Sequence, residues 1–198
     1  MVKLYYAKTD SLCDPTLFSE LYLLMPEERR EKINRLKNDD DKRLSLAAGV
    51  LNSFALLLNP DCKTNLSHSG NISLCAAGDS DVGCDVEKIK EANLKIAERF
   101  FAPSEYEALY KNSEPNRFFY RLWTAKEAFM KCTKLGFSLP MSEFEIDLAD
   151  GYALTQKVND KKYFFREYND ISGYAVICCS LSDDFCDIEE IDLEALLR

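Results

Sequence analysis

The stretch Arg121–Leu135 constrains the fold of this chain more than any other. It is rich in strong helix formers and contains neither glycine nor proline, so it predicts the main part of a helix within residues 115–135. Helical spacing places Trp123, Glu127 and Lys131 on one stripe, with Lys126 a step around the cylinder. Such a stripe is typical of a surface ion pair anchored by a tryptophan, or of one charged wall of a site.

A second stretch, Val82–Glu87, favours the charged site. Its short apolar run follows a turn at 78–80 and predicts a strand, on which Asp85 and Glu87 point to the same side. Two neighbouring carboxylates repel each other unless a positive charge lies between them, and Mg²⁺ shared with substrate phosphates is a common solution. Acids of this spacing also occur at solvated strand edges. Glu127 supplies a third carboxylate for the metal interpretation.

The third stretch, 65–70, contains His68, the one histidine of the chain. A single histidine is often a structural residue. Here Ser67 and Ser69 flank it and Gly70 follows, and small hydrogen-bonding residues of this kind suit a bound phosphate.

The remaining pattern predicts helices and strands in an α+β arrangement. Helices are expected at 16–25, 26–37, 43–58, 92–101 and 103–111. Strands are expected at 2–7, 72–77, 81–88, 143–149, 152–158, 161–168 and 173–180, with a short strand and helix within 188–197. Asp150-Gly151 and Asn169-Asp170 are typical turn pairs between the later strands.

Charge and composition exclude several classes of protein. The formal net charge of −9 argues against general nucleic-acid binding, although much of the acid lies in residues 181–198 and says little about a cleft elsewhere. No apolar run approaches the length of a membrane span, and the first residues lack the layout of a signal peptide. The eight cysteines form no C-x-x-C pair, so we interpret them as reduced thiols of a cytoplasmic protein.

In chain order, the three stretches read NLSHSG at 65–70, GCDVE at 83–87 and WTAKEAFMK at 123–131. In that order and at those separations they resemble the motifs of the 4′-phosphopantetheinyl transferases, specifically the surfactin-synthetase-activating type. The segments 96–109 and 136–146 also resemble the parts of that family that flank its third motif. The resemblance covers most of the chain from Pro26 onwards.

The resemblance implies an α+β fold of two similar halves related by a pseudo-twofold, with the active site in the cleft between them. We expect the halves to be residues 1–82 and 83–198, and the protein to be a monomer. The implied reaction moves the 4′-phosphopantetheine group of coenzyme A to a serine of an apo acyl or peptidyl carrier protein and releases 3′,5′-ADP. Neither nucleic acid nor a membrane is an expected partner.

The resemblance and the charges together assign a role to each site residue. Asp85, Glu87 and Glu127 would hold Mg²⁺. Glu127 would also take the proton of the serine hydroxyl, and Lys131 would stabilise or protonate the leaving phosphate. Trp123 is expected to be a packing residue.

Binding of coenzyme A is expected to involve a further set of residues, some of them in the charged segment 27–43, which could equally be a solvated helix face. The expected coenzyme contacts are Arg29, Lys32, Arg43, Ser67, His68, Lys126 and Lys131. Arg43 is assigned to the 3′-phosphate because a planar guanidinium suits a phosphate monoester.

The segment 59–65 departs from the family pattern, since it lacks several residues that include a glycine-lysine-proline sequence. This shortening leaves open a catalytically weakened or non-catalytic relative that binds the coenzyme or a carrier protein. A Mg²⁺-dependent phosphohydrolase is a further alternative, because three carboxylates do not identify the acceptor.

Overall fold

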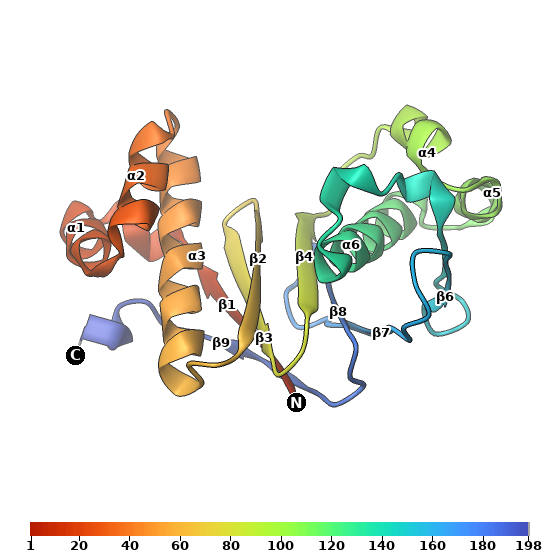
Figure 1. Ribbon diagram of the computed structural model, residues 1–198. Coiled ribbons are helices and arrows are strands. Elements are labelled where there is room, and N and C mark those ends of the chain that lie inside the picture. Colours follow the sequence, from red (N-terminus) through yellow and green to blue (C-terminus); the bar gives the residue numbers. More distant parts are fainter. Residues whose placement is uncertain (198) are drawn as a thin grey trace.

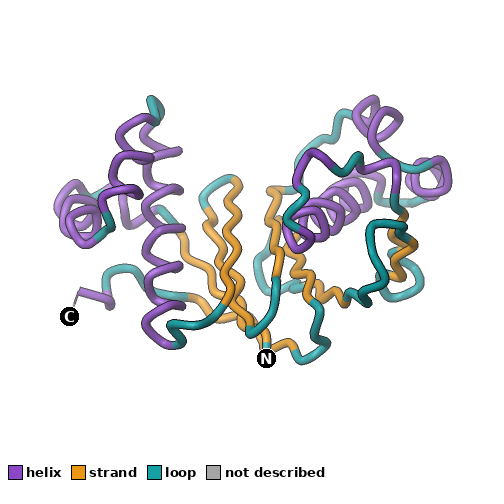
Figure 2. The backbone as a smooth tube through the Cα atoms, in the orientation of Figure 1, coloured by secondary structure: helices purple, strands orange, loops and turns teal. Residues whose placement is uncertain are grey.

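A computed structural model describes residues 1–197, arranged as two helix-and-sheet halves side by side (Figures 1 and 2). The helices are α1 (Pro15–Leu24), α2 (Glu27–Arg35), α3 (Asp39–Leu58), α4 (Leu94–Phe100), α5 (Pro103–Lys111) and α6 (Pro115–Thr133). The strands are β1 (Val2–Lys8), β2 (Lys63–Ser69), β3 (Ile72–Gly78), β4 (Val82–Lys88), β5 (Glu145–Asp147), β6 (Ala153–Thr155), β7 (Phe164–Glu167), β8 (Tyr174–Ser180) and β9 (Phe185–Glu190). Short 3₁₀ turns occupy Asp10–Cys13, Gly136–Ser138, Met141–Glu143 and Ala195–Leu197.

The first half is a four-stranded sheet, in the order β2-β3-β1-β9, covered by α3. Asn38 begins α3 by accepting a hydrogen bond from the backbone N–H of Asp40, and three aspartates follow in the first turn, where the helix dipole favours negative charge. The apolar residues of α3, among them Leu46 and Leu51, pack with Tyr5 of β1 in the core of this half. The helix is thereby fixed across the sheet.

The second half repeats this construction with α6 packed on the antiparallel sheet β4-β8-β7. Leu122, Phe129 and Ile177 are fully buried in its core. Gly83 of β4 lies directly under the helix, since an added Cβ would be 2.0 Å from the carbonyl oxygen of Ala128 and 2.4 Å from the backbone nitrogen of Cys132. A side chain at residue 83 would therefore push α6 away from β4.

A third apolar core joins the two halves, because the two sheets also pack against each other. Strand β1 contributes to both of its cores: Tyr5 and Ala7 face the helices, whereas Leu4 and Tyr6 face the second sheet. From the other half, Val86 and Val176 enter this shared core. Burial on both faces explains why the first strand reads as a nearly continuous apolar run.

The predicted α+β fold of two similar halves is confirmed. The long helices were predicted correctly, but β2 was not predicted, and β5, β6 and β7 are shorter than expected. The end of the chain also departs from a simple division at residues 82 and 83. Strand β9 pairs in parallel with β1, and Ile191 and Leu193 enter the core of the first half. The proposed boundary of 1–82 and 83–198 stays a prediction, and the segment from β9 onwards packs with the first half.

We predict that Gly83→Ala lowers the free energy of unfolding by about 3 kcal/mol, because the new methyl group overpacks the backbone of α6. Gly151→Ala is the matched control. Gly151 has a φ of +58° but open space around it, so only the cost of a left-handed alanine, about 1 kcal/mol, is expected there. Urea unfolding of both variants measures the difference, and equal losses would contradict the close approach of α6 and β4.

Candidate functional site

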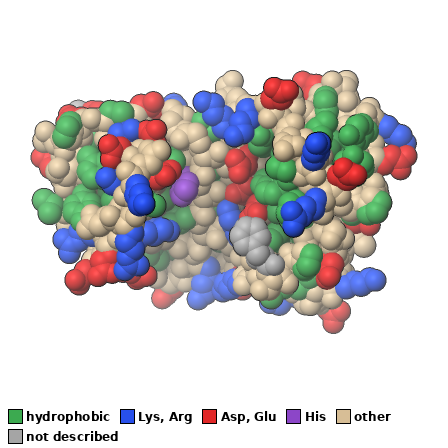
Figure 3. Space-filling model, turned by 90° about the horizontal axis from the view of Figure 1, so that it is seen from above, with side chains coloured by type: hydrophobic (Ala, Val, Ile, Leu, Met, Phe, Trp, Pro, Cys, Tyr) green, Lys and Arg blue, Asp and Glu red, His purple; other side chains and the backbone are tan. Residues whose placement is uncertain are grey.

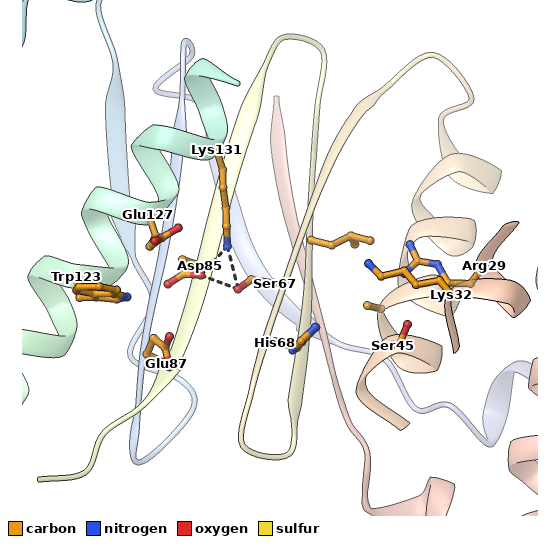
Figure 4. A pocket seen from close by; sticks show the side chains of 12 residues that line it. Arg29, Lys32, Ser45, Ser67, His68, Asp85, Glu87, Trp123, Glu127 and Lys131 are labelled. Carbon is orange, nitrogen blue, oxygen red and sulfur yellow. Dashed lines mark hydrogen bonds and ion pairs between the residues drawn. The ribbon is translucent and has the colours of Figure 1, made fainter. Parts of the chain in front are cut away.

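A cavity of about 370 Å³ lies between the halves and takes one wall from each (Figure 4). The residues that line it are Arg29, Lys32, Ser45, Ala48, Leu66, Ser67 and His68 from the first half, and Asp85, Glu87, Trp123, Glu127 and Lys131 from the second. In the view from above, the histidine lies on the side of the first half, and acidic side chains gather across from it (Figure 3). The cavity thus has a mainly basic and a mainly acidic wall.

The acidic wall comes from β4 and α6. Asp85 and Glu87 are two residues apart on the strand and point to the same side, and Glu127 faces them from the helix (Figure 4). Asp85 is 4% exposed, and its Oδ2 atom is buried without a hydrogen-bond partner among the described residues. An unpartnered buried carboxylate oxygen is costly in a folded protein and is typical of a ligand site.

Lys131 compensates part of this negative charge. Its Nζ atom lies 2.7 Å from Oδ1 of Asp85 and 3.2 Å from both the hydroxyl of Ser67 and the carbonyl oxygen of Cys84. Burial is the largest single effect on the pKa of Lys131 and lowers it, but the charges of Asp85 and Glu127 and the hydrogen bond to Asp85 act together in the opposite direction, and the pKa is raised. The ammonium is therefore held in its charged form beside the carboxylates.

Within residues 1–197, the two remaining acids, Glu87 and Glu127, form no ion pair of this kind. Burial raises the pKa of Glu127, and the neighbouring charges of Asp85 and Glu87 raise it further. Burial likewise raises the pKa of Glu87, although a hydrogen bond from Ser69 opposes the shift. Both carboxyls are thus harder to ionise than an exposed glutamate, because burial and like charges both oppose the charged form.

The basic wall comes from α2 and from β2. Arg29 and Lys32 are one helical turn apart on α2, and His68 points towards them from β2 (Figure 4). Gly49 of α3 allows α2 to pack closely, because an added Cβ would lie 3.0 Å from Cγ of Arg29. Partial desolvation lowers the pKa of His68, and the charges of Lys32 and Lys131 lower it further, so the imidazole is favoured in its neutral form. Cations and a neutral imidazole suit phosphate oxygens.

Comparison with known proteins identifies the family. Residues 81–179 match the model of the 4′-phosphopantetheinyl transferase superfamily. A 4′-phosphopantetheinyl transferase of Bacillus subtilis is 37% identical over 143 residues, which cover 70% of this chain and 64% of that protein. A second from Bacillus subtilis, ffp, is 30% identical in an alignment that covers 99% of this chain and 100% of its own. This chain belongs to the 4′-phosphopantetheinyl transferase family.

Two further relatives complete the comparison. The 4′-phosphopantetheinyl transferase Sfp of Bacillus subtilis strain 168 is 35% identical over 70% of this chain and 64% of its own length. The chain thus spans less than two thirds of two of these transferases in their alignments. The holo-[acyl-carrier-protein] synthase of Thermotoga maritima is a structural neighbour with a TM-score of 0.45 and 22% identity, covering 50% of this chain and 61% of its own. Within residues 1–197, no helix has both the length and the apolar character needed to cross a membrane.

One residue predicted to contact the coenzyme, Lys126, lies outside the cavity. Lys126 does not reach the cavity, because its side chain is fully buried on another side of α6. Its Nζ atom donates to the carbonyl oxygens of Met141 and Phe144 at 2.8 and 2.7 Å and pairs with Glu105 at 2.8 Å. The carboxylate of Glu105 also accepts hydrogen bonds from two backbone N–H groups. Lys126 therefore connects α6 to α5 and to the segment 141–146 and is not available to a phosphate.

Arg43 and Trp123 also differ from expectation in part. Arg43 is not among the residues that line the cavity, and its guanidinium pairs with Asp40 in the first turns of α3. Its contact with the 3′-phosphate stays a prediction. Trp123 stacks on Phe119 with ring centroids 5.8 Å apart, as a packing residue would, yet it also lines the cavity beside Glu127.

Sequence reasoning missed one hydroxyl residue, Ser45, and expected a different contact for another, Ser69. Ser45 of α3 lines the cavity with a buried Oγ atom that has no partner among residues 1–197, and no motif marks it. Ser69 was expected to suit a phosphate, but its hydroxyl instead donates to Glu87 at 2.8 Å. Its alternation with Ser67 on a strand would have indicated this, had β2 been predicted.

The donor set fits a hard divalent cation, although the side chains do not yet form a closed site. Three carboxylates line one cavity, and Oδ2 of Asp85 is free to accept a cation. As the side chains stand, no group of three or more histidine, cysteine, aspartate or glutamate residues within 1–197 is arranged to hold a metal ion. The Mg²⁺ site at Asp85, Glu87 and Glu127 stays a prediction.

We predict that Lys126→Met lowers the free energy of unfolding by about 3–5 kcal/mol, because it leaves the buried carboxylate of Glu105 without its cation. Urea unfolding measures the loss. Lys111→Met is the control, since Lys111 pairs with Glu107 on the surface and should contribute less than about 1 kcal/mol. A double variant, Lys126→Met with Glu105→Leu, should recover much of the loss. A stable Lys126→Met protein would contradict the structural role.

We predict a pH dependence from the two raised carboxyl pKa values. Glu87 and Glu127 have pKa values above their ordinary 4.5 in the folded protein, so the metal-free protein loses stability as pH rises through that window. Mg²⁺ should offset this loss, stabilising by about 2.7 kcal/mol near neutral pH when present at about 100 times its dissociation constant, and by less in mild acid. Thermal melts with and without Mg²⁺ measure the effect. A Mg²⁺ stabilisation that is equal or larger in acid would contradict it.

Proposed function

We propose that this protein transfers the 4′-phosphopantetheine group of coenzyme A to a serine hydroxyl of an apo carrier protein, acyl or peptidyl, and releases 3′,5′-ADP. The observation that carries the proposal is the pairing of walls in one cavity. The carboxylates of Asp85, Glu87 and Glu127 face Arg29 and Lys32 across it. A pyrophosphate that spans such a cavity is neutralised from both sides. The named activity of the relatives supports the same assignment.

Asp85, Glu87 and Glu127 are the side chains that would hold Mg²⁺, whose chemistry is the neutralisation of charge on the pyrophosphate. The raised pKa values of Glu87 and Glu127 support this assignment, as does the unpartnered oxygen of Asp85. Arg29, Lys32 and His68 would bind the remaining phosphate oxygens of the coenzyme. The basic wall would thus orient the donor while the acidic wall holds the reacting phosphorus.

The chemical step follows from the two groups on α6. The serine oxygen forms a bond to the phosphorus that carries the pantetheine arm, and the bond from that phosphorus to the bridging oxygen breaks. Glu127 would accept the hydroxyl proton, for which its raised pKa makes it a better base than an ordinary exposed carboxylate. Lys131 would stabilise the negative charge on the leaving 3′,5′-ADP, since its ammonium is held charged at the acidic wall.

A second candidate, a weakened or non-catalytic coenzyme-binding relative, is favoured by one observation. Helix α3 ends at Leu58 and β2 begins at Lys63, so the connection in which the family pattern has a glycine-lysine-proline sequence is short here. Lys63 is exposed and does not line the cavity. Measuring turnover beside coenzyme A affinity separates the two functions, because the second predicts binding without transfer.

We further propose a monomeric protein of the cytoplasm. The two halves already supply both walls of the cavity, so a second copy is not needed to complete it. The eight cysteines are free thiols, and six of them are buried, which fits a reducing compartment.

We predict that Asp85→Ala and Glu127→Gln each reduce transfer to an apo carrier protein at least about 100-fold, because one removes a cation ligand and the other removes the proton acceptor. Intact-protein mass spectrometry of the carrier, incubated with coenzyme A and Mg²⁺, counts the modified fraction. Glu20→Gln, a charge change on the exposed face of α1, is the control and should leave transfer unchanged. Full labelling by Asp85→Ala, or labelling that survives chelation of the metal, would refute the assignment.

A further inference from the structure

Strand β2 belongs to the first half, but the hydroxyls along it are used by the second. Ser67 donates to Oδ1 of Asp85 at 2.6 Å, and Ser69 donates to Oε2 of Glu87 at 2.8 Å. Asn65 joins the same row by accepting the backbone N–H of Cys84 at 2.9 Å. Because side chains two apart on a strand point the same way, one face of β2 meets β4 across the boundary between the halves.

The two hydroxyls differ in what their removal would change. Asp85 is held by Lys131 as well as by Ser67, so it has two partners in place. Glu87 sits near the end of β4, is only partly buried, and has Ser69 as its one hydrogen-bond donor within residues 1–197. A glutamate with three rotatable side-chain bonds loses its fixed direction when its one partner is removed.

The geometry of Ser69 defines the direction of its bond. Its Oγ atom accepts the backbone N–H of Lys88 at 3.2 Å, which leaves the hydroxyl proton for Glu87. A hydroxyl has one proton and two lone pairs, so this arrangement satisfies it from both neighbours on β4. Two hydrogen bonds therefore fix the side chain of Ser69 against the end of β4.

The turn that follows Ser69 is clamped by a residue of the second half. Tyr174 of β8 donates its hydroxyl proton to Oδ1 of Asn71 at 2.7 Å and accepts the backbone N–H of Asn71 at 3.2 Å. Gly70, between Ser69 and Asn71, has a φ of +62°, and a Cβ there would lie 2.3 Å from the hydroxyl oxygen of Tyr174. Tyr174 is also the partner of Lys88 across the β4–β8 ladder. The clamp therefore fixes the turn relative to β4.

We propose that Ser69 is a positioning residue that aims the carboxylate of Glu87 at the cavity for a divalent cation, and that Tyr174 acts through Ser69 by seating the turn. The inference rests on the proposed function and extends it, because it makes the first half a determinant of cation affinity. Outer hydrogen-bond partners of ligand carboxylates commonly change metal affinity about 10- to 100-fold when they are removed.

The test measures cation binding directly. Mn²⁺ is titrated into the metal-free full chain by calorimetry, and coenzyme A affinity is measured separately without metal. Ser69→Ala should weaken Mn²⁺ binding about 10-fold. Its affinity for coenzyme A should stay within about twofold of that of the wild type. Ser69→Thr, which retains the hydroxyl, should bind Mn²⁺ as the wild type does. Tyr174→Phe should weaken Mn²⁺ binding less than Ser69→Ala does. The double variant, Ser69→Ala with Tyr174→Phe, should bind Mn²⁺ no more weakly than Ser69→Ala alone.

Thr64→Val is the matched control, because Thr64 lies on the same strand but donates its hydroxyl to Asn52 of α3 at 2.7 Å. It should leave Mn²⁺ binding unchanged. If Ser69→Ala does not fold, Ser69→Cys replaces it, since a thiol keeps the size of the side chain and donates a much weaker hydrogen bond. Weakened Mn²⁺ binding by Ser69→Cys would support the proposal, and unchanged binding would overturn it.

The outcomes separate this inference from the proposed function. Wild-type binding of Mn²⁺ together with unchanged binding by Ser69→Ala overturns the role of Ser69 and leaves the carboxylate site intact. Equal losses of Mn²⁺ and coenzyme A affinity in Ser69→Ala and Ser69→Thr also overturn it, because they indicate a purely structural effect. A wild-type protein that transfers phosphopantetheine without binding Mn²⁺ or Mg²⁺ would overturn the cation site and this inference, but not the transfer reaction.

Discussion

Helix α6 and strand β4 approach each other backbone to backbone at Gly83, and the geometry of the acidic wall depends on that approach. The helix carries Glu127 and Lys131, whereas the strand carries Asp85 and Glu87. Any side chain at residue 83 would separate the two elements and lengthen the 2.7 Å contact between Lys131 and Asp85. The smallest residue of the motif thus sets the distances between the charged ones.

Charge is distributed unevenly over the cavity, and this distribution is more informative than the net charge of the chain. One ammonium, that of Lys131, stands among three carboxylates on the second half, while Arg29 and Lys32 lie on the first. A bound group that carries negative phosphates and a divalent cation together would satisfy both walls. The overall charge of −9 reflects acids elsewhere, many of them near the end of the chain.

Much of the fold could be predicted from the sequence because its long helices have regular patterns and clear boundaries. Helix α6 is rich in strong helix formers from Arg121 onwards, and α3 has an Asn cap followed by aspartates. Strand β2 was not predicted, because its residues Asn65, Ser67 and Ser69 are polar on the face that meets β4 rather than apolar on the face of a core. Local sequence patterns identify strands by their apolar residues, whereas one face of β2 forms hydrogen bonds to β4 through polar side chains.

The candidate site was predictable to the extent that motifs name residue types, and less so where one step along a helix changes the environment. Lys126 and Glu127 are adjacent in sequence, yet a rotation of one residue turns the first into the core and the second into the cavity. The partner that keeps Lys126 buried, Glu105, lies on a different helix, so no spacing within the motif indicates it. Tertiary partners of this kind decide whether a charged residue serves a ligand or the core.

Strand β9 gives this architecture a consequence for how the chain is made. The sheet of the first half needs residues 185–190 as its edge, and Ile191 and Leu193 complete the core beneath α3. During synthesis, β1 therefore leaves the ribosome unpaired on one side, and it stays so until residues 185–190 have also emerged. Truncation before residue 185 would expose that open edge of β1 to pairing with other chains.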